Sequence, residues 1–106
     1  MLDRFVPVAR ASAVAPGTLA WGAVDGARVV VANVDGAFYV LADACGHRQA
    51  SLSRGRLEGH TVECPLHFAR FDVRTGRLLD GPTSADVPTY EVRVEDDTVY
   101  AKRPAR

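Results

Sequence analysis

The sequence lacks an apolar run long enough to span a bilayer, so it predicts no transmembrane helix. It also predicts no signal peptide, because charged residues stand near its start and no apolar stretch with a cleavage site follows them. Its net charge is zero, whereas a protein that binds nucleic acid needs a basic surface to meet the phosphates. We therefore expect a cytoplasmic protein that binds neither membranes nor nucleic acids and keeps its thiols reduced.

A convincing helical period is also absent, and short β-rich runs between turn signals take its place. The runs at 28–34 and 37–42 flank Asp35-Gly36, a pair typical of a hairpin turn in which both central residues take positive φ. Residues 90–95 alternate apolar and charged side chains, which is the period of a strand with one buried face. Further strands are expected at 18–24 and 98–102, with turns at Asp25-Gly26 and Asp96-Asp97. This pattern predicts an all-β sandwich or barrel.

The segment 43–83 differs from the rest of the chain. Strand-like alternation fades there, and the segment holds both cysteines and all three histidines. We interpret it as a loop-rich region that carries the chemistry and is set into a β framework. Trp21 and Phe38, outside the segment, are expected in the core of that framework.

Two short motifs in this region each offer one thiol and one imidazole. They are Cys45-Gly46-His47 and Cys64-Pro65-Leu66-His67, separated by 16 residues. Cysteines with nearby histidines, in a reducing compartment, more often mark a metal site than a disulfide. Both cysteines and two of the three histidines fall in the pattern, so the motifs together indicate a joint metal site.

Three other interpretations of the motifs stay open on the pattern alone. The four residues could have separate structural roles, since a lone cysteine is commonly a small buried hydrophobe. Cys45 and Cys64 could form a disulfide, which a reducing compartment disfavours. The four could hold structural zinc, although zinc sites usually pair Cys with Cys and His with His along the chain, and here the order alternates. His60 lies outside both motifs, and we expect it to be a solvated turn residue.

The sequence resembles the Rieske family of iron–sulfur proteins over most of its length, most densely from residue 45 to residue 90. The matching features are Cys45-x-His47, Gly55-x-Leu57-x-Gly59, Cys64-Pro65-Leu66-His67, Phe71-Asp72, Thr75-Gly76, Gly81-Pro82 and Val87-Pro88-x-Tyr90-x-Val92. One departure is that many relatives have glycine directly after the second histidine ligand, where this chain has Phe68.

The resemblance implies a cofactor and its ligands. One [2Fe-2S] cluster is expected per chain, with its inner iron held by Cys45 and Cys64 and its outer iron by His47 and His67. Neutral imidazoles leave the outer iron less electron-rich than thiolates would, so the added electron settles there and the potential exceeds that of an all-cysteine cluster. The loop around Gly81-Pro82 is expected to cover one side of the cluster.

The resemblance also implies a fold and a function. We expect a single Rieske-like domain over 1–106, an antiparallel β-sandwich or barrel with a loop-rich cluster-binding subdomain at about 43–83. The implied protein is a Rieske-type ferredoxin, a soluble one-electron carrier that is not itself an enzyme. It would pass electrons from an NAD(P)H-dependent flavin reductase to a terminal oxygenase that acts on aromatic rings. The alternatives are a small electron-transfer subunit of another reductase, such as the nitrite reductase type, and a structural zinc module.

The partners of such a carrier are expected to dock briefly beside the histidine ligands of a monomer, because electron-transfer interfaces are small. The residues that we expect at this surface are Gly46, Arg48, Phe68 and Pro82.

The resemblance predicts a low reduction potential. High-potential relatives carry two further cysteines that join the two ligand loops, and this chain has Ala50 and Leu66 at those positions. Those relatives also place a serine and a tyrosine where this chain has Ala69 and Phe71. Neither side chain can donate a hydrogen bond to sulfur, so the reduced state loses a source of stabilisation.

Overall fold

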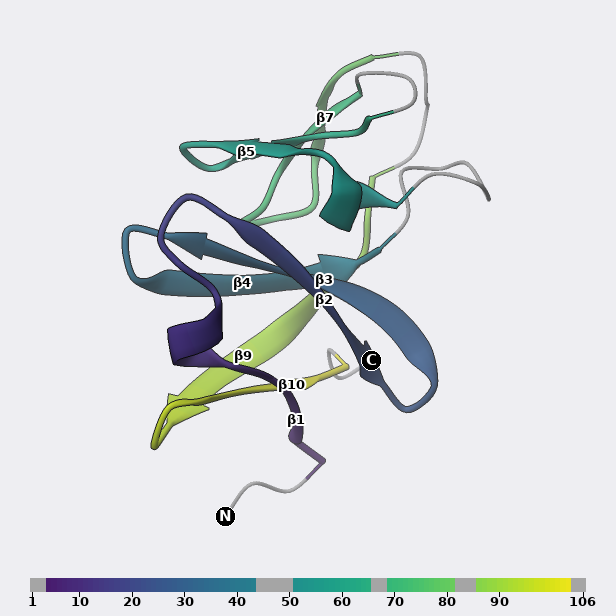
Figure 1. Cartoon of the computed structure of the whole chain (residues 1–106). Coiled ribbons are helices and arrows are strands. Elements are labelled where there is room, and N and C mark those ends of the chain that lie inside the picture. Colours follow the sequence, from purple (N-terminus) through teal and green to yellow (C-terminus); the bar gives the residue numbers. More distant parts are fainter. Residues whose placement is uncertain (1–3, 44–50, 66–68, 82–85, 104–106) are drawn as a thin grey trace.

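The computed structural model describes residues 4–43, 51–65, 69–81 and 86–103 (Figure 1). Of these, 57% lie in strands and 7% in short helical turns. The helical turns are η1 (Ala11–Ala13) and η2 (Leu52–Arg54), each a single 3₁₀ turn. In the described ranges no helix has the length and apolar character needed to cross a membrane. The predicted all-β class is confirmed.

The larger sheet has six antiparallel strands and curls into a nearly closed barrel. In spatial order the strands are β1 (Val6–Arg10), β10 (Thr98–Lys102), β9 (Thr89–Glu95), β4 (Ala37–Ala42), β3 (Ala27–Val34) and β2 (Leu19–Val24). β1 and β2, at the two ends of this order, also contact each other. The barrel thereby covers most of its own strand edges, which limits pairing with other chains.

The predicted hairpin turns are present, with the backbone conformation expected of them. Asp35 and Gly36 have φ of 52° and 94°, and the Val34–Ala37 pair closes the turn between β3 and β4. The turns at Asp25-Gly26 and Asp96-Asp97 likewise have positive φ at both residues. The right-handed twist of the flanking strands favours such turns, so these pairs set the strand register locally.

β3 is buried on both faces. Val29 and Val31 point into the barrel core, whereas Val30 and Ala32 point into a second core on the other side of the sheet. This explains why the strand is a continuous apolar run rather than an alternating one. The barrel core consists of Val14, Val24, Val29, Val31, Val40, Val99 and Ala101.

A small antiparallel sheet packs over the outer face of β3 and β4 and encloses the second core (Figure 1). Its strands are β5 (Arg56–Glu58), β6 (Thr61–Glu63), β7 (Arg70–Asp72) and β8 (Leu78–Asp80). These strands fall within the segment that we interpreted as loop-rich. Three residues are too few to display an alternating pattern, so the sequence did not distinguish them from loops.

The expected core position of Trp21 is wrong, since 59% of this residue is exposed. Gly22 and Val24 on the same strand are buried, so the alternation of β2 turns Trp21 outward. There the Arg28 guanidinium lies 4.3 Å from the centre of the indole ring. Phe38 is half-buried and packs against the barrel core, as expected of a framework residue.

Gly76 provides a test of the packing between the two sheets. Its φ is +77°, its carbonyl accepts a hydrogen bond of 2.8 Å from the Val87 amide, and a Cβ at this position would collide with the Val87 carbonyl. We expect Gly76→Ala to lower the free energy of unfolding by more than about 2 kcal/mol, because it combines a left-handed backbone with a steric clash. Urea unfolding of the purified protein measures this loss.

Gly36→Ala is the matched control, since Gly36 has φ of +94° and a methyl group at this position would meet open space, with no atom of another segment within 4 Å. Its expected cost is the backbone term alone, about 1–2 kcal/mol. If both variants lost the same free energy of unfolding, the chain at Val87 would have moved aside without cost, contrary to the expected steric clash.

Candidate metal centre

Cys64 is the predicted ligand that the structure describes; Cys45, His47 and His67 lie outside the described residues. Cys64 follows β6 and is fully buried. Its amide donates a 2.7 Å hydrogen bond to the Ala69 carbonyl, directly after the Glu63–Arg70 pair of β6 and β7. The second motif is therefore carried at the end of a closed hairpin.

The residues that flank the three predicted loops meet at this end of the molecule. Leu52, Cys64 and Ala69 share the second core, which brings a residue five positions after the first motif into the same core as the second motif. Gly81 approaches Ala69 so closely that a Cβ on Gly81 would collide with the alanine, at 2.5 Å from its Cα. The expectation that the loop around Gly81-Pro82 covers one side of the cluster stays a prediction, since Gly81 is described against Ala69 and Pro82 is outside the described residues.

The third loop is also closed at its base by a side chain. Asp86 accepts a 2.8 Å hydrogen bond from the Leu78 amide, across the residues that include Gly81. The Val87 amide then donates to the Gly76 carbonyl. These two bonds join Gly76 and Leu78, at the start of β8, to Asp86 and Val87, which follow the third loop. They thereby help to hold Gly81 against Ala69.

Asp43 was missed by the sequence analysis. Its carboxylate is fully buried and accepts hydrogen bonds from Arg28 Nε at 2.7 Å and from the Ser53 amide and hydroxyl, both at 2.8 Å. The only sequence signal was its position, an acidic residue directly after an apolar strand and two residues before Cys45. Its partners are distant in sequence, so their convergence was not readable from the chain.

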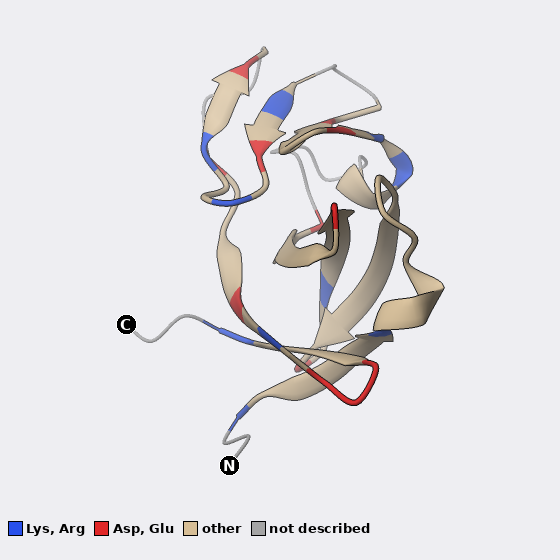
Figure 2. Cartoon of the chain, turned by 90° about the vertical axis from the view of Figure 1, so that its left-hand side faces the viewer, with Lys and Arg blue, Asp and Glu red and all other residues tan. Residues whose placement is uncertain are grey.

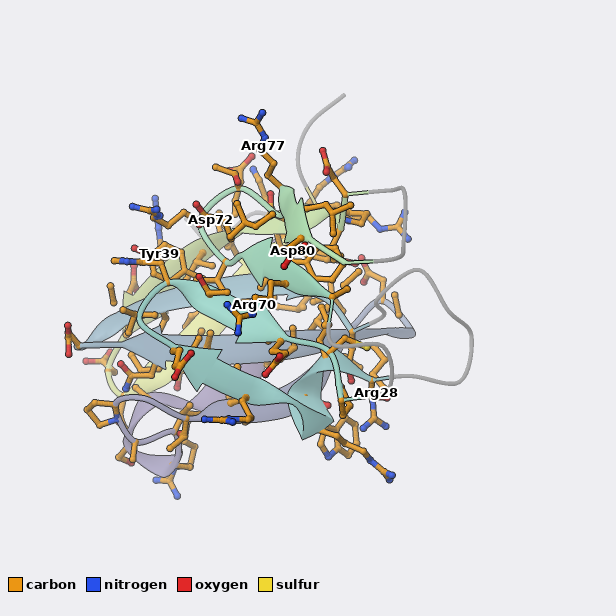
Figure 3. The ribbon with its side chains drawn as sticks, turned by 90° about the horizontal axis from the view of Figure 1, so that it is seen from above. Arg28, Tyr39, Arg70, Asp72, Arg77 and Asp80 are labelled. Carbon is orange, nitrogen blue, oxygen red and sulfur yellow. The ribbon has the colours of Figure 1, made fainter. Side chains whose placement is uncertain are left out.

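His60 lies at the other end of the small sheet from Cys64, in the β5–β6 turn. Its ring packs edge-on against Tyr39, with the centroids 5.9 Å apart, so the expected solvated turn residue is a turn residue that is half-buried. Figure 3 shows Tyr39 and Asp72 on one side of the molecule and Arg28 on the other. The described part of the structure thus separates His60 from the predicted site.

The charged residues near His60 form a local pair. Arg74 donates hydrogen bonds of 3.0 Å from Nε and Nη2 to the Asp72 carboxylate. This contact lowers the pKa of Asp72 from its usual value and raises the pKa of Arg74. The pair keeps both groups ionised and stabilises the β7–β8 turn.

Comparison with known proteins identifies the family. The model of the Rieske [2Fe-2S] domain matches residues 4–91. This chain belongs to the Rieske family. The match extends over the barrel strands up to β9 as well as the small sheet, so both layers belong to the shared fold.

Several relatives of this chain are ferredoxins of oxygenase systems. The ferredoxin component of the naphthalene 1,2-dioxygenase/salicylate 5-hydroxylase systems of a Ralstonia species is 42% identical over 79 residues, 74% of this chain and 76% of the relative. The ferredoxin of carbazole 1,9a-dioxygenase from Nocardioides aromaticivorans IC177 superposes with a TM-score of 0.88 at 32% identity, covering 94% of this chain and 98% of that one. A ferredoxin solved in complex with the reduced oxygenase of carbazole 1,9a-dioxygenase is 34% identical, with a TM-score of 0.86 and coverage of 97% and 98%.

A Rieske domain holds one [2Fe-2S] cluster per chain, and the described residues fit such a group. Cys64 places its sulfur at a position that excludes water, among Leu52, Ala69 and Phe71. A sulfur ligand in an apolar setting at the end of a rigid hairpin is protected from solvent and held in place. The prediction of an electron carrier rather than a catalyst is confirmed by the relatives.

The described surroundings of Cys64 offer no hydroxyl from residues 69 and 71. Ala69 and Phe71 are fully buried in the same core as Cys64. Phe71 lies on β7, which pairs with β6, and Ala69 directly precedes β7. Hydrogen bonds to sulfur favour the reduced state because reduction adds negative charge, and neither side chain can make one. We therefore expect the absence of these two donors to lower the reduction potential.

We expect a midpoint near the low end of the Rieske range, at roughly −150 mV. The double variant Ala69→Ser with Phe71→Tyr should raise it by about 120 mV, because two hydrogen bonds of about 1.4 kcal/mol each shift a one-electron couple by roughly 60 mV apiece. Voltammetry of the purified protein measures both values.

Val73→Thr is the matched control, since it adds a hydroxyl to the same core at the His60 end of the small sheet. The control should leave the midpoint unchanged. A wild-type midpoint above zero, or no rise in the double variant, would contradict this account of the site.

Proposed function

We propose that this chain is a Rieske-type ferredoxin that carries single electrons from an NAD(P)H-dependent flavin reductase to a terminal aromatic-ring oxygenase. The observation that carries the proposal is the near-complete mutual coverage, at 32% and 34% identity, with two solved ferredoxins of carbazole 1,9a-dioxygenase. One such ferredoxin is solved in complex with its oxygenase. The same reasoning supports a cytoplasmic protein whose thiols stay reduced before the cofactor is inserted.

Within this function, Cys45 and Cys64 would hold one iron and His47 and His67 the other. The bound cluster supplies a one-electron redox site. The two thiolates bring negative charge to their iron, and the two neutral imidazoles bring none, so the extra electron is favoured on the imidazole side. Burial of Cys64 supports the thiolate side as the inner one.

We further propose a single domain over 1–106 in which 43–83 forms the cluster-binding subdomain. The described part of that segment contributes the small sheet, and β3 and β4 form the wall beneath it. The three exposed large apolar residues of the described chain, Trp21, Leu79 and Val94, lie on three different strands. They form no common patch of the kind that marks a stable dimer interface, which supports a monomer.

The proposed docking surface consists of Gly46, Arg48, Phe68 and Pro82, beside the two histidines. These residues lie outside the described ranges, and their nearest exposed large apolar neighbour along the described chain is Leu79, three residues before Pro82. Partners in electron transfer must separate after each turnover, so an interface below about 1,200 Å² is expected. An arginine at its rim would steer acidic partner groups.

Metal and sulfide analysis tests the cofactor and its ligands. Purified wild-type protein should hold about two irons and two acid-labile sulfides per chain, as a two-iron cluster requires. Replacing any one of Cys45, His47, Cys64 or His67 by alanine should remove the native visible spectrum.

His60→Ala is the control and should keep the spectrum, because His60 packs against Tyr39 in the far turn. One zinc per chain without sulfide would establish the structural zinc site instead. A protein with neither metal nor sulfide would leave the disulfide or separate structural roles for the four residues.

Arg48→Glu tests the docking surface. Electron delivery to the oxygenase should slow by about tenfold at low salt and depend less steeply on ionic strength, because a steering charge is reversed. Stopped-flow transfer from the reduced protein measures the rate, and the visible spectrum should not change.

The control is Arg10→Glu, which reverses a charge with 81% of its side chain exposed, on β1 beside the β9–β10 turn. Equal rates in the two variants at low salt would remove Arg48 from the interface.

A further inference from the structure

Asp43 carries a buried carboxylate at the point where β4 leads into the segment of the first motif. Its side chain has no exposed surface, and three donors from two other elements meet it. Its own amide donates to the Arg28 carbonyl at 3.1 Å, so both the main chain and the side chain are attached to β3. The electron transfer proposed above makes no direct use of this group.

The donors to Asp43 lie on both sides of the first motif. Arg28 belongs to β3, which precedes the motif, and Ser53 belongs to η2, which follows it. The two Ser53 donors are ten residues from Asp43 along the chain. Asp43 and Ser53 flank residues 44–52, and the hydrogen bonds between them hold the two ends of this segment together.

The Arg28 side chain is itself held in place by Trp21. Its guanidinium lies 4.3 Å from the centre of the indole ring, within the range of a cation–π contact. This explains why an exposed tryptophan stands on β2. The ring orients the arginine that in turn neutralises the buried carboxylate.

We propose that Asp43 is a positioning residue, which holds Cys45 and His47 in the geometry that the cluster requires. The inference rests on the proposed function, which makes these two residues ligands. A buried carboxylate with three donors resists displacement, because moving it leaves a charge unpaired in an apolar setting. Asp43 and Ser53, which flank the first motif, are thereby tied to the barrel wall and to η2, whose Leu52 shares the second core with Cys64.

The chain contains a matched arrangement far from the site. Asp97, in the acidic β9–β10 turn (Figure 2), accepts hydrogen bonds from the Ser12 amide at 2.8 Å and hydroxyl at 2.7 Å, and Arg10 Nε lies 3.8 Å away. The partners are again Ser and Arg, and the bonds join the chain after β1 to the turn after β9. Variants of Asp97 and Ser12 therefore remove similar bonds without touching the segment that carries Cys45 and His47.

The experiment compares Asp43→Asn and Ser53→Ala with Asp97→Asn and Ser12→Ala in the purified cluster-loaded protein. We measure the rate constant of cluster loss to an excess of chelator by visible absorbance, and the g values of the reduced protein by electron paramagnetic resonance. Asp43→Asn should lose the cluster about tenfold faster, the factor that one lost charge-assisted hydrogen bond produces. Ser53→Ala should lose it faster by a smaller factor, and both should shift the g values.

The two controls should match the wild type in rate and in g values. Asp43→Glu separates position from charge, since it keeps the carboxylate and displaces it by one methylene; it too should speed cluster loss. Wild-type behaviour of Asp43→Glu, or equal effects in the two pairs, would overturn the positioning role. Ser53→Ala keeps the carboxylate and its other two donors, so it decides the matter even where Asp43→Asn does not fold.

A failure of this inference is distinguishable from a failure of the proposed function. Wild-type protein without iron and sulfide would refute the function itself. A wild-type cluster that Asp43→Asn and Ser53→Ala leave unchanged would refute only the role of Asp43.

Discussion

The burial of β3 and β4 on both faces is the constraint on which the rest of the structure depends. Val29 and Val31 close the barrel on one side, and Val30 and Leu41 support the small sheet on the other. Each apolar face must be covered, so neither layer is complete without this shared wall. The wall then fixes where the hairpin of β6 and β7 stands and, with it, the position of Cys64.

The site is supported by contacts between chain segments, not by any one element. Asp43 joins the wall to η2, the Cys64 amide joins β6 to Ala69, and Asp86 closes the chain around Gly81. Three-residue strands have little stability of their own and depend on such side-chain and core contacts.

The charges of the small sheet are mostly balanced locally. Arg56 pairs with Glu58, Arg70 with Glu63, and Arg74 with Asp72. Exposed pairs of this kind contribute little to stability, but they leave no broad field of one sign over the described sheet.

The sequence alone was enough to predict the Asp-Gly and Asp-Asp turns and most of the barrel strands, and its motifs indicated the family. Turns depend on adjacent residues and strands on a two-residue period, so both can be recognised locally. The strands β5 to β8 were not readable, since three residues show no period. The outward position of Trp21 and the burial of Asp43 were decided by tertiary structure. Their partner Arg28 is seven residues from Trp21 and 15 from Asp43, and only sheet pairing brings these side chains together.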